Sequence, residues 1–323
     1  MKTEKEYKAN LSIMKKDIMD VISSVCQETP LEGYELSYND RSYHIDLLYR
    51  NKNIAVVFHS IYYDKSYPND DHVIEPKYFV NRYIACRSSN IRLINIYEQD
   101  YFYKKDKILK FISDLFKKNE IIFARNCTIL PVNKHDKIKF INEYHLNGDS
   151  NQGSIAYGLY YKNELVSIMT FGMMRGQNPL RKNEGYYELV RFVNKDNYVI
   201  VGGASKLFTH FVRDYNPKYI LCYSDNDFFT GDTYKKLGFE FQGYGDKSLN
   251  YQWCSDNEAL QRQTCMVHKL LKKYPKYNDI EISGSKENYI MGDLGYYKVY
   301  RCSASKWIWK TSCEETPHIP TTY

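Results

Sequence analysis

The stretch Val201-Gly202-Gly203-Ala204-Ser205-Lys206-Leu207 decides the fold of the second half of this chain, because it joins a strand pattern to a helix pattern. Residues 187–192 before it (Tyr-Glu-Leu-Val-Arg-Phe) predict a strand. A glycine-rich turn at the start of a helix presents free backbone N–H groups at the positive end of the helix dipole, where phosphate binds well. The apolar residues after the turn recur at helical spacing, at Ala204, Leu207, Phe208, Phe211 and Val212.

The segments around this turn alternate between strand and helix patterns. Downstream, residues 219–223 predict a short buried strand, and residues 234–239 predict the end of a helix that stops at Gly238. Upstream, the patterns predict strands at residues 127–130, 153–161 and 165–172 and a helix at 136–144. We therefore expect an α/β domain over residues 121–310, with an appended β region at 281–309 and a disordered tail at 311–323.

The first part of the chain has a pattern that is complete in itself. It predicts a helix at residues 11–24, a hairpin of strands at 43–49 and 53–63, a helix at 78–88, a strand at 91–97 and a lysine-rich helix at 104–118. We therefore expect a separate α/β domain over residues 1–120.

The composition is that of an ordinary globular protein with two domains. The chain has 323 residues, of which 43% are hydrophobic and 26% charged, and no apolar run approaches the ~20 residues of a membrane span. Its charged start, with no apolar segment after it, predicts no signal peptide and a cytoplasmic location. The net charge of +6 is compatible with nucleic-acid binding but does not establish it.

The eight cysteines leave one metal hypothesis open. Cys254, Cys265, His268 and Cys302 could serve as zinc ligands, although their spacing matches no strong template. Buried thiols are the simpler interpretation of these cysteines.

Short blocks of residues follow one another in a fixed order along both halves of the chain. In the first half they include residues 39–42 (Asn-Asp-Arg-Ser), 45–46 (Ile-Asp) and 90–94 (Asn-Ile-Arg-Leu-Ile). In the second half they include residues 125–127 (Arg-Asn-Cys), 187–192, the glycine turn, 223–225 (Tyr-Ser-Asp) and 237–239 (Leu-Gly-Phe). With these blocks the chain resembles the free-standing homing endonucleases of phages, which join a small Vsr-like nuclease domain to a GNAT-like domain.

The resemblance implies a fold, a partner and a cofactor. The fold is an N-terminal mixed-sheet nuclease domain of the Vsr-like, PD-(D/E)xK type, followed by a C-terminal GNAT-like α/β domain. The partner is double-stranded DNA, the cofactor of cleavage is Mg²⁺, and the location is the cytoplasm of a phage-infected bacterial host.

The metal-ligand positions of the nuclease pattern are only partly kept. The family has Leu-Asp on the first hairpin strand, kept here as Ile45-Asp46, but it has a glutamate on the second strand where this chain has Val57. An aliphatic side chain cannot bind Mg²⁺, which prefers oxygen ligands. Two interpretations stay open. Asp46, His59 and Asp64 form a rearranged catalytic site with Asp46 as the metal ligand, or the domain has lost its metal and kept its shape.

Basic side chains in several places are candidates for contact with the DNA backbone. Each run of lysines is equally compatible with a solvated helix face. The candidates are Lys104, Lys105, Arg181, Lys182, Lys269 and Lys272.

The second half resembles the GNAT acyltransferases and therefore supports an alternative activity. The resemblance implies that the backbone amides of Gly202, Gly203, Ala204 and Ser205 bind the pyrophosphate of acetyl-CoA. It also implies that Glu188 is the general base and Tyr234 the general acid. The turn lacks the basic residue that usually begins it, because Tyr198-Val199-Ile200 precede it. A third hypothesis is a non-catalytic binding protein with a protein partner.

Overall fold

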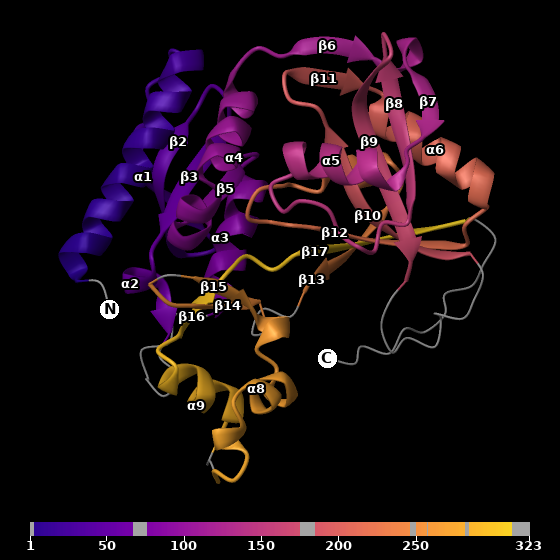
Figure 1. The fold of residues 1–323 in the computed structure, drawn as a ribbon. Coiled ribbons are helices and arrows are strands. Elements are labelled where there is room, and N and C mark those ends of the chain that lie inside the picture. Colours follow the sequence, from indigo (N-terminus) through magenta and orange to yellow (C-terminus); the bar gives the residue numbers. More distant parts are fainter. Residues whose placement is uncertain are drawn as a thin grey trace. The chain divides into compact units, whose positions relative to one another are not determined.

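The computed structural model describes residues 3–66, 76–174, 185–245, 250–256, 258–281 and 284–311, and its elements are labelled in Figure 1. The chain forms two compact units. Unit 1 contains Met1–Leu109, Asp225–Thr230 and Gly245–Ser303, and unit 2 contains Lys110–Ser224, Gly231–Tyr244 and Ala304–Tyr323. The units therefore differ from the expected division at residues 120 and 121, because the chain returns twice from the second half into unit 1.

Unit 1 is built on a mixed four-stranded sheet in the order β1-β2-β3-β5. The first three strands pair antiparallel, and β3 pairs in parallel with β5. The expected hairpin and the strand after it are thus present in one sheet. The elements are α1 (Glu4–Val25), β1 (Leu31–Tyr38), β2 (Arg41–Tyr49), β3 (Ile54–His59), α2 (Ile61–Asp64), α3 (Pro76–Ser88), β5 (Arg92–Tyr97) and α4 (Glu98–Phe116).

Strand β1 has no counterpart among the sequence predictions. It pairs with β2 across the turn Asn39-Asp40, where both residues have positive φ angles, 48° and 58°. Asparagine and aspartate tolerate this left-handed conformation better than other residues with a side chain, and such turns match the twist of a hairpin. The pattern of β1 was hidden because most of its residues are exposed.

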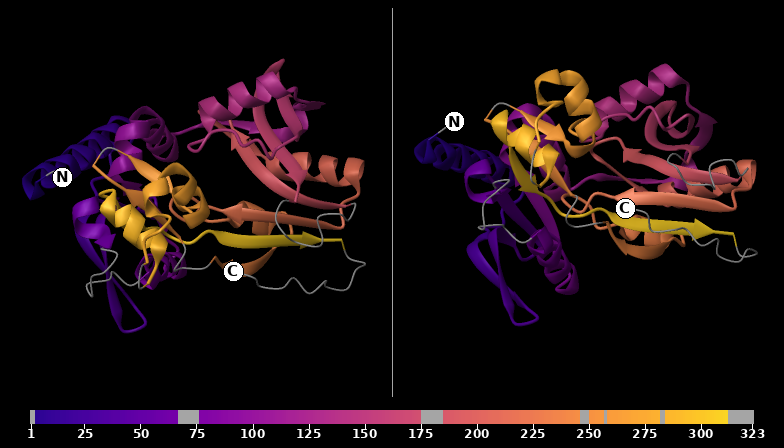
Figure 2. Two further views of the ribbon diagram at one scale, coloured as in Figure 1. Left: turned by 60° about the horizontal axis from the view of Figure 1, so that its bottom comes forward. Right: turned by 90° about the horizontal axis from the view of Figure 1, so that it is seen from below.

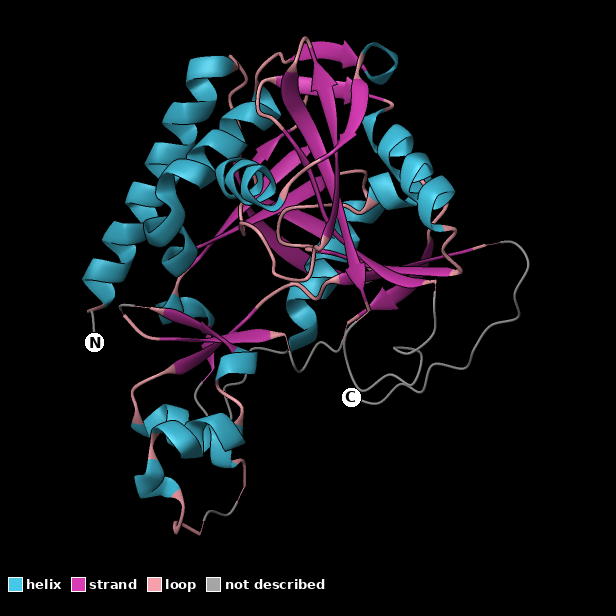
Figure 3. Cartoon of the chain, turned by 45° about the vertical axis from the view of Figure 1, so that its right-hand side comes forward, coloured by secondary structure: helices cyan, strands magenta, loops and turns pink. Residues whose placement is uncertain are grey.

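A second, smaller sheet of unit 1 has the order β15-β14-β16-β4. Figure 3 shows α8 and α9 together beside this sheet. The elements are β4 (Lys65–Ser66), β14 (Tyr251–Cys254), β15 (Ala259–Gln261), α8 (Val267–Lys273), α9 (Lys286–Asp293) and β16 (Tyr297–Tyr300).

Unit 2 contains a seven-stranded sheet in the order β13-β17-β12-β10-β9-β8-β7. Strands β7 to β10 pair antiparallel, whereas β10 and β12 pair in parallel. The elements of the sheet and its helices are β7 (Thr128–Pro131), α5 (Lys134–Tyr144), β8 (Ile155–Tyr161), β9 (Glu164–Met173), β10 (Tyr186–Asn194), α6 (Gly203–Tyr215), β12 (Tyr219–Ser224), α7 (Asp232–Lys236), β13 (Glu240–Tyr244) and β17 (Ser305–Lys310).

The expectation of one appended β region at residues 281–309 needs correction. That stretch contains the helix α9, and its two strands belong to different sheets: β16 pairs with β14 in unit 1, and β17 pairs with β12 and β13 in unit 2. Figure 2 shows β17, in yellow, among strands of unit 2 that come much earlier in the sequence. The strand is thus an integral part of the main sheet.

Helices cover both faces of the seven-stranded sheet. Phe140 and Ile141 of α5 pack on one face against Ile168, and Leu207 and Phe211 of α6 pack in the cluster on the other face. A separate parallel pair, β6 (Glu120–Phe123) and β11 (Tyr198–Val201), precedes α6. None of the helices in the described parts of the chain is both long enough and apolar enough to cross a membrane.

The ring of Phe211 is stacked on that of Phe171 in the middle of this core, with the ring centres 3.6 Å apart and both side chains fully buried. We expect Phe211→Ala to lower the free energy of unfolding of unit 2 by about 3–5 kcal/mol, because it removes buried contacts and leaves a cavity. Urea denaturation followed by the fluorescence of Trp307 and Trp309 measures this change. The exposed Thr209 on the same helix provides the control, since Thr209→Ala should change the value by less than about 0.5 kcal/mol.

Candidate functional site

The sheet of unit 2 opens between β10 and β12. Their parallel pairing ends at Leu189 and Cys222. Immediately after this point β10 has a bulge, because Val190 stands between Leu189 and Arg191 without an opposite residue on β9. A bulge bends the strand and disrupts the ladder locally. The two parallel strands therefore separate at a defined position.

Four side chains with acid–base chemistry gather at this point. Glu188 and Arg191 come from β10, Cys222 from β12 and Tyr234 from α7. The charges of Glu188 and Arg191 act on the pKa of Cys222, and the pKa of Arg191 responds in turn to Tyr234, Glu188 and Cys222. Arg191 is held in place because its Nε donates to the carbonyl oxygen of Gly148 at 3.0 Å. The arrangement thus brings a carboxylate and a phenol to the place where the strands part.

The hydroxyl of Tyr234 lies beside the side chain of Cys222, whose sulfur donates to the carbonyl oxygen of Tyr223 at 3.7 Å. Burial is the main cause that raises the pKa of Tyr234 well above its ordinary value, and burial raises the pKa of Cys222 to about 12. Both groups therefore keep their protons at neutral pH. A phenol in this state can act as a proton donor.

Helix α6 begins with amide groups that have no acceptor within the helix. Its N-cap is Gly202, whose φ of +77° lies in the left-handed region, and no side chain caps the helix. Lys206 donates from its backbone N to the carbonyl oxygen of Gly202 at 3.0 Å. The N–H groups of Gly203, Ala204 and Ser205 precede this first helical bond, so they point out of the helix start.

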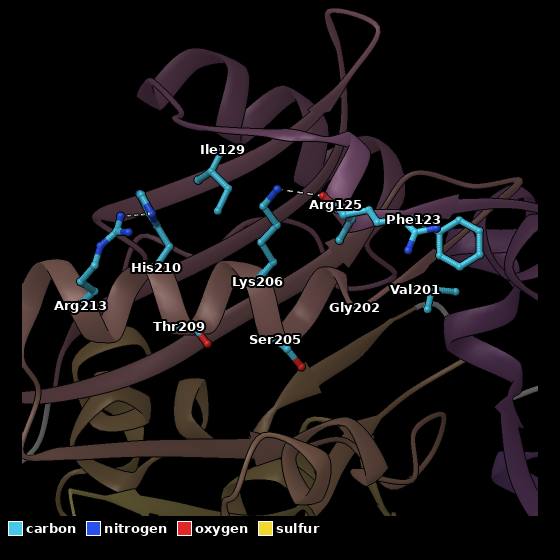
Figure 4. A pocket seen from close by; sticks show the side chains of 11 residues that line it. Phe123, Arg125, Ile129, Val201, Gly202, Ser205, Lys206, Thr209, His210 and Arg213 are labelled. Carbon is cyan, nitrogen blue, oxygen red and sulfur yellow. Dashed lines mark hydrogen bonds between the residues drawn. The ribbon is translucent and has the colours of Figure 1, made fainter.

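A pocket with a volume of about 790 Å³ lies along α6, as Figure 4 shows. Its wall on the other side is formed by the end of β6, by the 3-10 helix η1 (Ala124–Asn126) and by Ile129 of β7. Among the described residues that line it there is no carboxylate, whereas four carry or can carry positive charge. These four are Arg125, Lys206, His210 and Arg213.

The basic side chains of the pocket differ in the hydrogen bonds and ion pairs that they make with the protein. The ammonium group of Lys206 donates to the carbonyl oxygens of Ala124 at 2.9 Å and Cys127 at 2.6 Å, so it ties η1 to α6. At the other end, Arg213 donates to His210 at 2.7 Å and lies 3.4 Å from Asp214. No pattern in the sequence singles out these residues for a function, because their proximity depends on how η1 folds back onto α6.

In unit 1, Asp46 lies on β2, and both oxygens of its carboxylate lie close to groups of the protein. Its Oδ2 accepts from the backbone N of Phe58 at 2.9 Å, and its Oδ1 lies 3.7 Å from His44. The pairing of β2 with β3 ends at Leu47 and Val56, and the same register continued by one residue places Val57 opposite Asp46. The position where the resemblance requires a second carboxylate is therefore directly across the hairpin, and it carries an aliphatic side chain.

His59 is buried, and both of its ring nitrogens lie near polar groups of the protein. Its Nδ1 lies 3.2 Å from Asp64, and its Nε2 lies 2.9 Å from the guanidinium of Arg82 and 3.0 Å from the Asn95 side-chain oxygen. Nε2 thus faces one group that can only donate, the guanidinium of Arg82, and one oxygen that can only accept, that of Asn95. Nδ1 has no hydrogen-bond partner among the described residues. Asp64 accepts from the backbone N of Ser60 at 2.8 Å.

The described residues contain no group of three or more His, Cys, Asp or Glu side chains that could hold a metal ion. The hypothesis of a rearranged Mg²⁺ site from Asp46, His59 and Asp64 therefore has no support in the described residues. These residues equally give no support to zinc at Cys254, Cys265 and Cys302, which are buried free thiols.

Four of the six predicted DNA-contacting residues lie within the described parts of unit 1, and three of these four have protein partners. Lys104 and Lys105 lie 3.9 Å from Asp100 and 2.5 Å from Asp17. Lys269 donates to the carbonyl oxygen of Gln263, and Lys272 is exposed on α8. Arg181 and Lys182 lie outside the described residues. Contact with DNA stays a prediction.

The segment Asp225–Thr230 brings a buried carboxylate into unit 1 that no sequence pattern indicated. Oδ1 of Asp227 accepts from Asn95 and Tyr97, each at 3.2 Å, and from the backbone N of Cys302 at 3.3 Å. Its Oδ2 lies 3.5 Å from Arg301. Burial is the main cause that raises the pKa of Asp227 to about 7. The isolated Asp in the sequence gave no sign of this environment.

Solved structures similar to this chain include acetyltransferases. One from Bacillus subtilis, in complex with CoA, is 12% identical with a TM-score of 0.32, and the match covers 57% of this chain and 99% of that one. A GNAT family acetyltransferase from Elizabethkingia anophelis with acetyl-CoA bound is 13% identical with a TM-score of 0.30, covering 58% and 99%. The N-acetylglutamate synthase of Neisseria gonorrhoeae, complexed with coenzyme A and N-acetyl-glutamate, is 11% identical with a TM-score of 0.29, covering 79% and 51%.

No protein-family model matches the chain, and no curated protein matches it. TM-scores of 0.29–0.32 are too low to carry a conclusion about activity. The functional argument therefore depends on the geometry of unit 2 itself. The comparisons give no support to a nuclease.

With Asp46 on β2 and Val57 in place of a second carboxylate, we predict that Mg²⁺ does not bind to unit 1. We expect millimolar Mg²⁺ to leave the unfolding temperature of the protein unchanged, because a bound ion would raise it by mass action. Differential scanning fluorimetry with and without EDTA measures this. A rise with Mg²⁺ that Asp46→Ala abolishes would contradict the prediction.

The raised pKa of Asp227 predicts a pH dependence of stability. The folded protein holds this proton more tightly than the unfolded chain does, so the stabilisation is present at low pH and is lost as the pH rises towards about 7. Asp227→Asn keeps an oxygen acceptor and removes the titration. Urea denaturation between about pH 5 and pH 8 should show a smaller fall in the free energy of unfolding for the variant than for the wild type. Parallel slopes would contradict this assignment.

Proposed function

We propose that unit 2 is a GNAT-type acyltransferase that moves an acyl group from acyl-CoA to an amine. One observation carries the proposal. The parallel strands β10 and β12 separate at Leu189 and Cys222, and the phenol of Tyr234 lies beside Cys222 at this point. The same strand β10 is followed by β11 and by a helix whose N-terminal amides are capped by no side chain. The opening between the strands would accept the thioester of the donor, and the amides at the start of α6 would bind its phosphates.

The start of α6 would bind the pyrophosphate of the donor. The N–H groups of Gly203, Ala204 and Ser205 supply donors in a fixed orientation, and the helix dipole favours the negative charge. Gly202 is required because its positive φ aims the chain into the helix. The side chain of Ser205 lines the pocket at the same end.

Tyr234 would protonate the departing thiolate. When the amine attacks the thioester carbonyl, the carbon–sulfur bond breaks and the sulfur takes the electron pair and needs a proton. Tyr234 has the required proton at neutral pH, as an ordinary tyrosine also does, and burial, which raises its pKa, makes it hold that proton more tightly. Its hydroxyl lies beside the Cys222 side chain, at the point where the strands part.

Glu188 would take the proton of the attacking amine. It lies on β10, one residue before the end of the pairing with β12, and its charge acts on Cys222 and Arg191 nearby. A carboxylate within reach of the amine, directly or through one water molecule, is sufficient as a general base.

We expect acetyl-CoA at millimolar concentration to raise the unfolding temperature of the protein by several degrees, since a ligand bound only by the folded state stabilises it. Tyr234→Phe should bind acetyl-CoA equally well. It should release free CoA thiol at least about 100-fold more slowly in the presence of a mixture of amino acids, polyamines and a lysine-containing peptide.

The matched control is Tyr215→Phe, which removes the hydroxyl of a more exposed tyrosine at the end of α6 and should leave the release of thiol unchanged. No thermal shift and no release of thiol from the wild type would exclude the acyltransferase.

Unit 1 supports a second, narrower proposal. Its sheet has three antiparallel strands followed by a parallel fourth, and this mixed order is compatible with the resemblance to the Vsr-like nucleases. Val57 opposite Asp46 removes the second metal carboxylate. We therefore propose that unit 1 has this architecture without Mg²⁺-dependent cleavage. Binding to double-stranded DNA through it stays a prediction.

A further inference from the structure

The glycine turn of this chain lacks a basic side chain of its own, because Tyr198-Val199-Ile200 precede it. A donor with two phosphate groups brings more negative charge than backbone amides alone neutralise. The pocket along α6 supplies the missing charge from another element. Figure 4 shows Arg125 of η1 at the same end of this pocket as Gly202 and Ser205.

We propose that Arg125 is the cationic ligand for the diphosphate of the acyl donor, and that it makes the site select CoA over donors without phosphate. This inference rests on the acyltransferase function proposed for unit 2. The proposal adds a residue to the phosphate site. Arg125 lies almost eighty positions before Gly202, outside the strand β11 and the helix α6 that the glycine turn joins.

Arg125 is available for such a ligand. Its side chain is exposed and its guanidinium carbon lies 4.9 Å from the centre of the Phe123 ring. Within the described residues no carboxylate forms an ion pair with it. Contact with an aromatic face restricts the guanidinium without neutralising it. The group therefore keeps its full charge and its five N–H donors for a phosphate.

Lys206 holds Arg125 near the helix start. It donates to the carbonyl oxygens of Ala124 and Cys127, the residues on either side of the Arg125-Asn126 pair. These bonds fix η1 against α6 at the turn that follows Gly202. Lys206 is thus a positioning residue, and its own charge adds to the positive potential of the pocket.

The far end of the pocket has less free charge to offer. There Arg213 and His210 bond to each other, and Asp214 lies 3.4 Å from Arg213 and 3.3 Å from His210. The positive potential of the pocket is therefore strongest near Arg125 and the helix start. This gradient favours a ligand whose phosphates lie at the end next to Gly202.

The experiment compares the binding of two probes by isothermal titration calorimetry with the full-length protein. CoA contains the diphosphate, and pantetheine contains the same thiol arm without phosphate. Arg125→Ala should raise the Kd for CoA about tenfold or more and leave the Kd for pantetheine unchanged, because only CoA offers the phosphate to be bound. Arg125→Lys should recover part of the loss, since it keeps the charge but not the planar fork.

Two further variants sharpen the comparison. Lys206→Met should also weaken CoA binding and not pantetheine binding, because it releases η1 from α6. Lys139→Ala removes an exposed positive charge on α5, on the opposite face of the sheet, and should leave both Kd values unchanged. Unfolding temperatures of all variants without ligand verify that they fold.

The outcomes separate this inference from the proposed function. If the wild type binds CoA and Arg125→Ala binds it equally well, the role of Arg125 is refuted and the acyltransferase proposal stands. An equal loss for CoA and pantetheine also refutes the role, because the effect would not depend on phosphate. If the wild type binds neither CoA nor inorganic pyrophosphate, both proposals fail together.

Discussion

The end of the pairing between β10 and β12 is the constraint on which the proposed site depends. Parallel strands that stay paired leave no room between them, since the ladder holds them about 4.8 Å apart. Here the extra residue Val190 bends β10 away after Leu189, and the next residues of β12 pair only with β17. The edge so created explains why Tyr234 can reach the sulfur of Cys222 and why polar groups such as Glu188 and Arg191 are tolerated within an otherwise apolar sheet.

The glycine pair of the turn connects this opening to the helix that follows. Gly202 takes a left-handed conformation, and Gly203 has no room for a side chain, because a Cβ there would lie 2.8 Å from the Cγ2 of Ile200. These two requirements explain why the sequence has Gly-Gly at this place. They also make the turn rigid, so the amides of α6 keep one orientation. The same close packing is compatible with a purely structural turn. The binding experiments with CoA, rather than the glycines themselves, therefore distinguish the two interpretations.

The elements of this turn were predictable because they have strong periodic patterns, whereas the division of the chain was not. Leu207, Phe208 and Phe211 are buried as their helical spacing predicts, and β10 and β12 lie where apolar runs indicated them. Strand β1 was missed because its exposed side chains leave no alternation, although Asn39-Asp40 is a recognisable hairpin turn. The return of residues 245–303 to unit 1 depends on pairings between distant strands, such as β16 with β4, and local patterns contain no information about them. Arg125 and Asp227 were missed for the same reason.

In unit 1, the resemblance in sequence bears on the order of the strands but does not extend to the metal ligands. Unit 1 contains a mixed sheet, and the register of the hairpin, continued by one residue past Leu47 and Val56, places Val57 opposite Asp46. A carboxylate at position 57 would stand beside a second negative charge in a largely buried position and would need a cation to offset the repulsion. Valine removes that requirement, and the neighbouring His59 lies 2.9 Å from the guanidinium of Arg82. A mixed sheet in unit 1 is therefore no argument for cleavage, because cleavage would depend on carboxylates and not on the order of the strands.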